Sequence, residues 1–461
     1  MVDVDNTSGF FPTNQTNGVV AIFTIATSDP VNLQSQGLAY SFDNGYTFTM
    51  YEGTPVLDLG LANFRDPKVS WYEDHWVMVV AYATAFKIGV FTSPDLKNWT
   101  LASDFSHHGI LGYAYECPNL VEVPYQKKDG SSNGTLWLLQ VSINPGGPQG
   151  GSATQYFPGT FDGYTFTPVD EATRFIDFGK DNYAGQFFYN TPSVIAESVG
   201  PIAIDWSSNW QYAQTVPTGP IEGWRSAMTL PRTVMLREVG SGDGTDIAFV
   251  SPPFDLDPLL GQQLLPRTNL TNTSTAIDFS SIYSGAVYFL AEARDVAGNF
   301  PTGGTLNFTF LSPISGETLH FGVFFGAEQP VFINRGGTKA FDNPFFTDKF
   351  STSTFNGVGV VQGIIDRSVF EVFLNGGERS GTASLFTEEP LSILSIASGG
   401  LQPSNISVSV TAWELLSTWR GQEDANGIVL GNVTSTMDNA TSAMGNVTKR
   451  EHGRVLYEAQ F

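Results

Sequence analysis

The sequence predicts an all-β protein built from two successive β domains. Short runs rich in Val, Ile, Tyr, Phe and Trp alternate with turns that carry Gly, Pro, Asn and Asp, as strands and their connections do. Examples of such runs are 19–26, 76–82, 88–92 and 136–143. No stretch shows the apolar period of a long amphipathic helix. The 461 residues are enough for two or more domains with cores of their own.

A weak internal repeat runs through the first half of the chain. Each copy is a strand, an Asp-bearing tight turn and an aromatic residue that starts the next strand, and the copies are 40–49, 91–100 and 156–166. Their closing aromatics are 51 and 67 residues apart. A four-stranded propeller blade takes ~40–50 residues, so the spacing fits a β-propeller with insertions. The same pattern is also the general signature of a β-hairpin.

Composition divides the chain into four parts. Strands extend to residue 236, so a first β domain is predicted over 1–236. Gly, Ser and Pro clusters then give 237–265 the character of a linker. Strands resume over 266–418, where we predict a β-sandwich. The last part, 419–461, is polar and poor in aromatics, and we expect a tail there.

Charge and cysteine content limit the partners of the protein. The formal net charge is −23, and such a chain is repelled by nucleic acid and by anionic membranes. A neutral substrate such as a sugar is not repelled, although the acidity can equally serve solubility alone. Cys117 is the only cysteine, so no intrachain disulfide can form.

Glycosylation sequons point to the secretory route. The Asn-x-Ser/Thr pattern occurs at Asn6, Asn14, Asn98, Asn133, Asn269, Asn272, Asn307, Asn405, Asn432, Asn439 and Asn446. These are acceptors for N-glycans if the chain is secreted. The printed chain shows no signal peptide and no apolar run of the ~18 residues that span a bilayer. We therefore expect an extracellular protein whose leader is not part of the printed sequence.

Two acidic residues stand out for chemistry. Asp66 follows Arg65, and a proline ends the strand just after the pair, which places two charges where loops meet a pocket. A structural ion pair would give the same pattern. Glu116 lies between Tyr115 and Cys117 in an apolar strand, where desolvation raises the pKa of a carboxyl group, as a general acid for a glycosidic oxygen requires. An outward-facing Glu on an edge strand is the alternative.

Tryptophans with polar neighbours suit a sugar ligand. Trp210 has Asn209 beside it, and Trp224 is followed by Arg225. Sugars present apolar C–H faces and hydroxyl rims, which match indole platforms and amide or guanidinium donors. Core tryptophans are the alternative, and we favour that interpretation for Trp224. The five histidines do not form a ligand set, so neither a metal nor another cofactor is expected.

Several strings, taken in this order, resemble glycoside hydrolase family 32, which contains invertases, exo-inulinases and levanases. In the first domain these strings are Asn6-Thr7-Ser8-Gly9-Phe10-Phe11, Asn63-Phe64-Arg65-Asp66-Pro67-Lys68-Val69, Tyr115-Glu116-Cys117-Pro118, Ile143-Asn144-Pro145-Gly146, Gln155-Tyr156-Phe157, Asp177-Phe178-Gly179-Lys180-Asp181 with Tyr183-Ala184, Ser208-Asn209-Trp210-Gln211-Tyr212 and Trp224-Arg225-Ser226. In the second they are Ile365-Asp366-Arg367-Ser368 and Glu371-Val372-Phe373. The similarity extends from residue 1 to about 415, and its specificity lies in the co-occurrence of the strings.

The resemblance implies a fold and a mechanism. The family has a five-bladed β-propeller with a funnel-shaped site, followed by a β-sandwich, and the first blade would be incomplete in this chain. Its retaining mechanism passes through a covalent fructosyl intermediate on sucrose or a β-fructan. By similarity, Glu116 is the acid/base and Asp66 the transition-state stabiliser. Arg65 joins Asp66 on the fructose hydroxyls, and Trp210 forms a wall of the fructose pocket. Asn209 is predicted as a further sugar contact from its own amide beside Trp210, not from the resemblance.

The chain departs from the family at two places. The family nucleophile lies in a Trp-Met-Asn-Asp-Pro-Asn-Gly motif upstream of the string that begins here at Asn6, and the printed sequence contains no Asn-Asp-Pro-Asn. We therefore expect a chain truncated at its N-terminus and inactive as printed, with exposed strand edges that favour aggregation or a homodimer. Asn119 is the second departure, because many members have Gly or Asp after Glu-Cys-Pro, and this bears on the tuning of the acid.

Two further functions stay open: a non-catalytic relative that binds fructose or sucrose, and a fructosyltransferase, since transfer depends on acceptor-side loops and access of water.

The printed chain is expected to release no fructose from sucrose in a coupled assay, whereas an upstream extension that carries the nucleophile motif should restore release. Turnover by the printed chain at the rate of an ordinary invertase would contradict the expected truncation. Calorimetric binding of fructose without turnover would support the binding relative.

Overall fold

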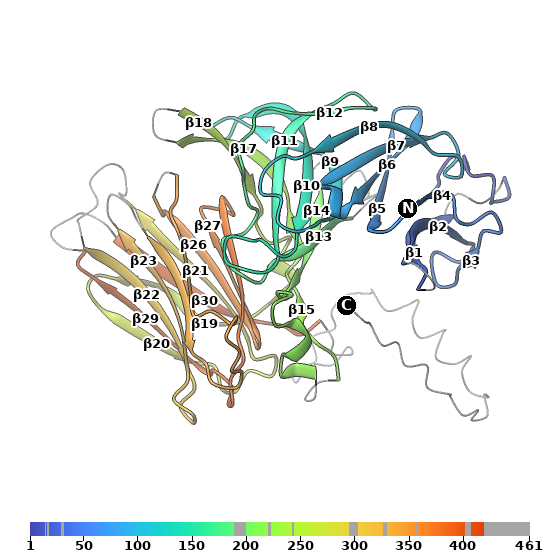
Figure 1. The fold of residues 1–461 in the computed structure, drawn as a ribbon. Helices are drawn as coiled ribbons and strands as arrows, with labels where there is room; N and C mark the ends of the chain where they lie inside the picture. Colours follow the sequence, from blue (N-terminus) through green and yellow to red (C-terminus); the bar gives the residue numbers. More distant parts are fainter. Residues whose placement is uncertain are drawn as a thin grey trace, which may run out of the picture. The chain divides into compact units, whose positions relative to one another are not determined.

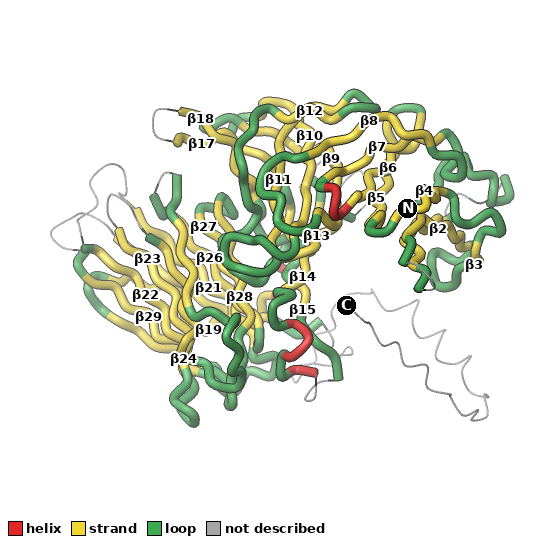
Figure 2. Tube along the Cα trace, viewed as in Figure 1, coloured by secondary structure: helices red, strands yellow, loops and turns green. Residues whose placement is uncertain are grey.

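Strands make up nearly all of the regular structure, which confirms the all-β prediction (Figure 2). The computed structural model describes residues 1–13, 15, 18–28, 32–188, 200–219, 223–241, 244–294, 303–325, 330–355, 357–401 and 407–418. Short 3₁₀ turns occur at η1 (Ala83–Ala85), η2 (Ala213–Thr215) and η3 (Asp257–Leu259). Within the described ranges no helix has the length and apolar character needed to cross a membrane. The tail predicted over 419–461 lies outside the described residues.

The first half of the chain forms sheets of antiparallel strands, most of which pair with a neighbour in sequence (Figure 1). The first sheet contains β1 (Val19–Ala26), β2 (Gln34–Ser41), β3 (Thr49–Met50) and β4 (Leu57–Leu61), and the second contains β5 (Phe64–Tyr72), β6 (His75–Tyr82), β7 (Lys87–Ser93) and β8 (Thr100–Ser106). The third contains β9 (Tyr115–Gln126), β10 (Ser132–Ile143), β11 (Ala153–Phe161) and β12 (Phe166–Pro168), and the fourth contains β13 (Tyr183–Phe187), β14 (Ile202–Ser207), β15 (Ala227–Met228) and β16 (Arg232–Thr233).

The first strands of these sheets, β1, β5, β9 and β13, contact one another in order, as the inner strands of propeller blades do. Strand β6 is buried on both faces, which explains its nearly continuous apolar run. Val77 and Val79 pack toward the third sheet, whereas Met78 and Val80 pack toward the first. Because side chains alternate between the two faces of a strand, β6 contributes to two hydrophobic cores. The number of blades stays a prediction.

The predicted linker over 237–265 is wrong for much of its length. β17 (Met235–Ser241) and β18 (Gly244–Val250) form an antiparallel hairpin with the register Ser241↔Gly244, and β17 joins the third sheet parallel to β9. The Gly-rich stretch that suggested a linker includes the paired strand ends Gly240–Ser241 and Gly244–Thr245. Val239, Ala248 and Val250 are buried, and this burial stabilises the pair.

The second domain is a β-sandwich of two six-stranded sheets. One sheet has the order β19 (Leu260–Leu270), β30 (Ser407–Leu415), β21 (Ala286–Arg294), β26 (Val360–Asp366), β27 (Val369–Leu374) and β28 (Arg379–Ser384). The other has the order β20 (Ser274–Asp278), β29 (Ile393–Gly399), β22 (Gly304–Leu311), β23 (Thr318–Phe325), β24 (Val331–Gly337) and β25 (Lys349–Thr352). Fully buried rings from both sheets, among them Phe289, Phe308 and Phe370, fill the space between them. Burial of each such ring contributes ~2–3 kcal/mol.

Two buried arginines join the segment before β13 to the sandwich. Arg232 lies 3.2 Å from Asp177 and 2.7 Å from Glu371, measured between guanidinium nitrogens and carboxylate oxygens. Arg335 lies 2.7 Å from Asp181, and both of these side chains are fully buried. Removing one partner of a buried pair costs ~3–5 kcal/mol because the other charge stays buried without compensation. These ion pairs therefore fix the segment that leads into β13.

Asp205 of β14 adds a further carboxylate to this buried cluster. Burial raises its pKa to about 6, with Arg232 opposing the shift and Asp177 and Glu371 adding to it. Burial also raises the pKa of Glu371. Asp205 Oδ1 has no hydrogen-bond partner in the described part of the chain. One guanidinium thus faces three carboxylates, and the fold accommodates Asp205 best as the neutral acid.

The free energy of unfolding of the wild type is expected to fall as the pH rises from 4 to 7, and Asp205→Asn is expected to reduce this fall. A carboxyl group whose folded pKa is about 6 and whose unfolded value is 3.8 ionises first in the unfolded chain. The free energy of unfolding therefore falls as the pH rises through this window and levels off above pH 6, by roughly 3 kcal/mol. Urea unfolding across this pH range measures the effect, and the exposed Asp342→Asn is the control. If the free energy of unfolding depended equally on pH in wild type and Asp205→Asn, the prediction would be wrong.

Candidate active site

The first strands of three successive sheets carry the same irregularity. Asp66 in β5, Cys117 in β9 and Ala184 in β13 have φ angles of 63°, 47° and 53°. Each lies where the strand register shifts, which marks a β-bulge. A left-handed backbone costs a non-glycine residue about 1–3 kcal/mol, and bulges re-aim the side chains beside them. The strands β5, β9 and β13 thus each have a bulge that redirects side chains, and these strands are neighbours.

Side chains on one sheet bind backbone N–H groups on the next. The amide of Asp66 donates to Thr24 Oγ1 of β1 at 3.0 Å, and the amide of Cys117 donates to Asp66 Oδ2 at 3.0 Å. The amide of Phe187 donates to Asn119 Oδ1 at 3.3 Å. We call these three bonds the inter-sheet relay. They link β1, β5, β9 and β13, which belong to four different sheets.

Arg65 lies beside the two carboxylates that the sequence singled out. Its Nη2 is 2.7 Å from Glu116 Oε1, and its Nε is 3.9 Å from Asp66 Oδ2. The side chains of Arg65, Asp66 and Glu116 are 20%, 28% and 15% exposed, so all three are partly shielded and still reachable. The structure therefore brings these three predicted site residues together.

Burial governs the protonation of the neighbouring groups. It raises the pKa of Asp66, and the hydrogen bond from Cys117 N and the charge of Arg65 oppose that shift. Burial also raises the pKa of the Cys117 thiol well above its usual value, and the adjacent carboxylates of Asp66 and Glu116 add to the shift. Cys117 therefore remains a neutral thiol and is no thiolate nucleophile.

Tyr183 is a site residue that the sequence did not single out. Its hydroxyl donates to Glu116 Oε2, so Arg65 and Tyr183 hold the two oxygens of that carboxyl. Burial and the charge of Glu116 raise the pKa of Tyr183 well above its usual value, which keeps the phenol a donor. The available signal was its place in the family-like string after Asp181, 67 residues beyond Glu116.

Trp210 joins this group through an aromatic chain. The Trp206 ring lies 6.2 Å from Tyr183 and 5.1 Å from Trp210, measured between centroids. Trp206 and Trp210 line a cavity of about 420 Å³ together with Gln214, Trp224 and Arg225. Trp224 is 64% exposed, so the interpretation as a core tryptophan is wrong. An open cavity with indole walls and polar rims suits a sugar ring.

Asn209 does not fit the predicted role of a sugar contact. The residue is fully buried, and its Nδ2 lies within hydrogen-bond distance of the carbonyl oxygens of Gly150, Ser152 and Lys180. Its Oδ1 accepts from Gln211 N at 3.0 Å. The amide therefore has no group left for a ligand and instead ties loops together behind Trp210.

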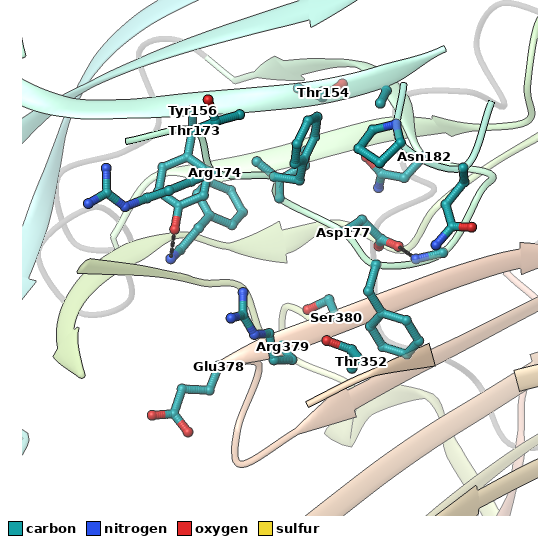
Figure 3. A pocket seen from close by; sticks show the side chains of 18 of the residues that line it. Thr154, Tyr156, Thr173, Arg174, Asp177, Asn182, Thr352, Glu378, Arg379 and Ser380 are labelled. Carbon is teal, nitrogen blue, oxygen red and sulfur yellow. Dashed lines mark hydrogen bonds between the residues drawn. The ribbon is translucent and has the colours of Figure 1, made fainter. Parts of the chain in front are cut away.

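A second cavity, of about 300 Å³, lies between the segment 173–179 and the start of β28 (Figure 3). Its charged groups are largely paired: Arg174 binds Asp170 and Asp246, and Asp177 binds Arg232. Neither Glu116 nor Asp66 lines it. This cavity is therefore separate from the Arg65 cluster. Across the described ranges, His, Cys, Asp and Glu side chains form no group of three or more that could hold a metal ion.

Known proteins resemble this chain over most of its length. The Glycosyl hydrolases family 32 N-terminal domain matches residues 5–245, and the Glycosyl hydrolases family 32 C terminal matches residues 290–414. An extracellular exo-inulinase of Meyerozyma guilliermondii is 38% identical and an invertase of Kluyveromyces lactis 35% identical, each over 84% of this chain and 74% of the relative. A β-fructofuranosidase from Schwanniomyces occidentalis, solved with fructosyl-erythritol, has a TM-score of 0.78 at 34% identity, over 90% of this chain and 82% of that one.

Tyr183→Phe is expected to lower the free energy of unfolding by ~1–3 kcal/mol, because a shielded oxygen of Glu116 loses its donor. A double-mutant cycle with Glu116→Gln should show a coupling energy of at least ~0.5 kcal/mol. Tyr125→Phe is the matched control, since Tyr125 donates to Glu238 at a more exposed place. Additive effects of the two changes on urea unfolding would show that Tyr183 does not hold Glu116.

Proposed function

Since the chain belongs to glycoside hydrolase family 32, we propose that it is a β-fructofuranosidase that releases fructose from sucrose or β-fructans. The observation that carries the proposal is the Arg65 guanidinium beside the carboxylates of Asp66 and Glu116, which come from bulges of adjoining strands. A glycosidase needs an acid for the leaving oxygen and negative charge for an oxocarbenium-like transition state.

The roles follow from the partners of each group. Glu116, held by Arg65 and Tyr183, protonates the glycosidic oxygen and later takes a proton from water. Asp66, fixed by the Cys117 amide, binds fructose hydroxyls with Arg65 and stabilises the positive charge that develops at the anomeric carbon. Trp210 packs on the apolar face of the sugar. Retention also requires a nucleophilic carboxylate ~5–5.5 Å from the acid, a step to which we assign no described residue.

The substrate class and location are extended from the relatives. The exo-inulinase of Meyerozyma guilliermondii is named extracellular, and the relative of Kluyveromyces lactis is named an invertase. We propose that this protein likewise acts outside the cell, on sucrose or a fructan. Sequon residues Asn98, Asn133 and Asn269 are exposed in the structure, as N-glycan acceptors must be.

Glu116→Gln should lower kcat for sucrose by ~10²–10⁴-fold, because the leaving oxygen loses its acid. Fructose binding, measured by calorimetry, should persist. The loss should be smaller for an aryl fructoside, whose leaving group needs no protonation. Glu122→Gln is the matched control, since Glu122 lies on the same strand with its side chain exposed. Equal losses in both variants would refute the role of Glu116.

The product ratio separates the remaining functions. Equal glucose and fructose indicate hydrolysis, whereas an excess of glucose indicates fructosyl transfer. If the printed chain releases no fructose, the same assay on a chain extended by the nucleophile motif of the family distinguishes an incomplete site from a wrong assignment. No release by either chain, together with calorimetric binding of fructose, would leave a binding protein.

A further inference from the structure

Asn119 connects two of the bulges that form the site. The residue lies in β9, two positions beyond the bulge at Cys117, and is fully buried. Its Nδ2 donates to Cys117 O at 3.2 Å and to Gly185 O at 2.8 Å, while its Oδ1 accepts from Phe187 N at 3.3 Å. One amide thus binds both its own bulge and the strand that carries the bulge at Ala184.

These bonds replace a backbone ladder that is absent between the two strands. β9 and β13 belong to different sheets, so no ladder joins them. Two donors and one acceptor are required at this place, and an asparagine amide supplies both kinds. The strand end is also held from other sides, since Gln140 Nε2 donates to Gly185 O at 3.2 Å and Lys68 Nζ donates to Phe187 O. Buried backbone groups at this place are thereby satisfied.

Both backbone carbonyls that Asn119 binds lie close in sequence to Glu116 or to the residue that donates to its carboxyl. Cys117, whose carbonyl Asn119 binds, directly follows Glu116 in the chain. Gly185, whose carbonyl it also binds, lies two residues after Tyr183, the donor to Glu116 Oε2. A shift of either strand would therefore move Glu116 or its donor.

We propose that Asn119 is a positioning residue that holds the Glu116 carboxyl through the backbones of β9 and β13. The inference rests on the proposed function, in which Glu116 is the acid/base. Without the amide, the left-handed backbone of Cys117 loses a stabilising bond and can relax toward a regular strand. A displacement of ~1 Å at a catalytic group can cost about a hundredfold in rate.

The test compares Asn119→Ala with Asn375→Ala. Asn375 is the control in the sandwich, because its amide makes the same kinds of bond: its Nδ2 donates to Gly357 O at 2.6 Å, and its Oδ1 accepts from Gly359 N at 2.9 Å. In a chain that hydrolyses sucrose, Asn119→Ala should lower kcat by about ten- to a hundredfold with little change in KM. Asn119→Asp keeps the acceptor for Phe187 N, so its kcat should lie between those of wild type and Asn119→Ala. Asn375→Ala should lower Tm and leave kcat unchanged.

A second readout is independent of turnover. Cys117 is the only cysteine of the chain, so its rate of reaction with dithiobis-nitrobenzoate under native conditions reports the state of the bulge. This rate should rise in Asn119→Ala and stay at the wild-type value in Asn375→Ala.

The outcomes separate the inference from the proposed function. Similar losses of Tm in both alanine variants, with unchanged kcat and equal Cys117 rates, would make Asn119 purely structural and overturn the inference. Absence of fructose release from both the printed chain and the chain extended by the nucleophile motif would overturn the proposed function instead. In that case a faster Cys117 reaction in Asn119→Ala would still support control of the bulge by Asn119, and an unchanged rate would refute it.

Discussion

The site depends on a backbone constraint: Asp66, Cys117 and Ala184 hold left-handed conformations that L residues avoid. Such a conformation persists only where the surroundings stabilise it. The inter-sheet relay provides this stabilisation at two of the bulges, because Thr24 and Asp66 bind the amides of Asp66 and Cys117. The third bond of the relay, from Phe187 to Asn119, holds the strand that carries Ala184. Each sheet thus fixes the bulge region of the next, and the position of the chemical groups is a property of several sheets together.

The buried ion pairs between the domains also help to fix the position of β13, one of the strands that carry the bulges. The pairs of Arg232 with Asp177 and of Arg335 with Asp181 anchor the chain before β13, the strand that begins at Tyr183. Asp205 lies on β14, the strand that pairs with β13. Its carboxyl is buried beside charges that only partly compensate it, so the protonated form suits the fold. This cluster therefore couples the stability of the fourth sheet to pH, and acidic conditions favour it.

Local sequence pattern was sufficient for the fold class, and it singled out three charged residues that the structure brings together. Runs of β-branched and aromatic residues predicted the strands, and the context of Glu116 and of the Arg65–Asp66 pair pointed to chemistry. The linker was wrong because a Gly-rich stretch serves a flexible connection and a tight hairpin turn equally well. Composition does not separate the two, whereas the pairing of β17 with β18 does.

Residues whose role depends on distant partners could not be predicted in this way. Asn209 has the residue type of a sugar contact, but backbone carbonyls from three loop positions occupy its amide. Tyr183 and Asn119 act across 67 and 66 residues of sequence, toward Glu116 and Gly185 respectively. Nothing in their local surroundings encodes these contacts, because they arise only when adjoining sheets pack against each other.

The charge balance of the cluster explains why this rigidity matters for chemistry. One guanidinium faces two carboxylates, so the cluster carries one negative charge when both are ionised and none when one is protonated. In the proposed mechanism, proton transfer from Glu116 to a leaving oxygen therefore creates negative charge beside the carbon where positive charge develops. In a shielded site this field acts strongly only if its groups do not reorganise during the reaction. The relay from Thr24 to Phe187 meets this condition, since Asp66 and the backbone beside Glu116 are already held by hydrogen bonds before substrate arrives.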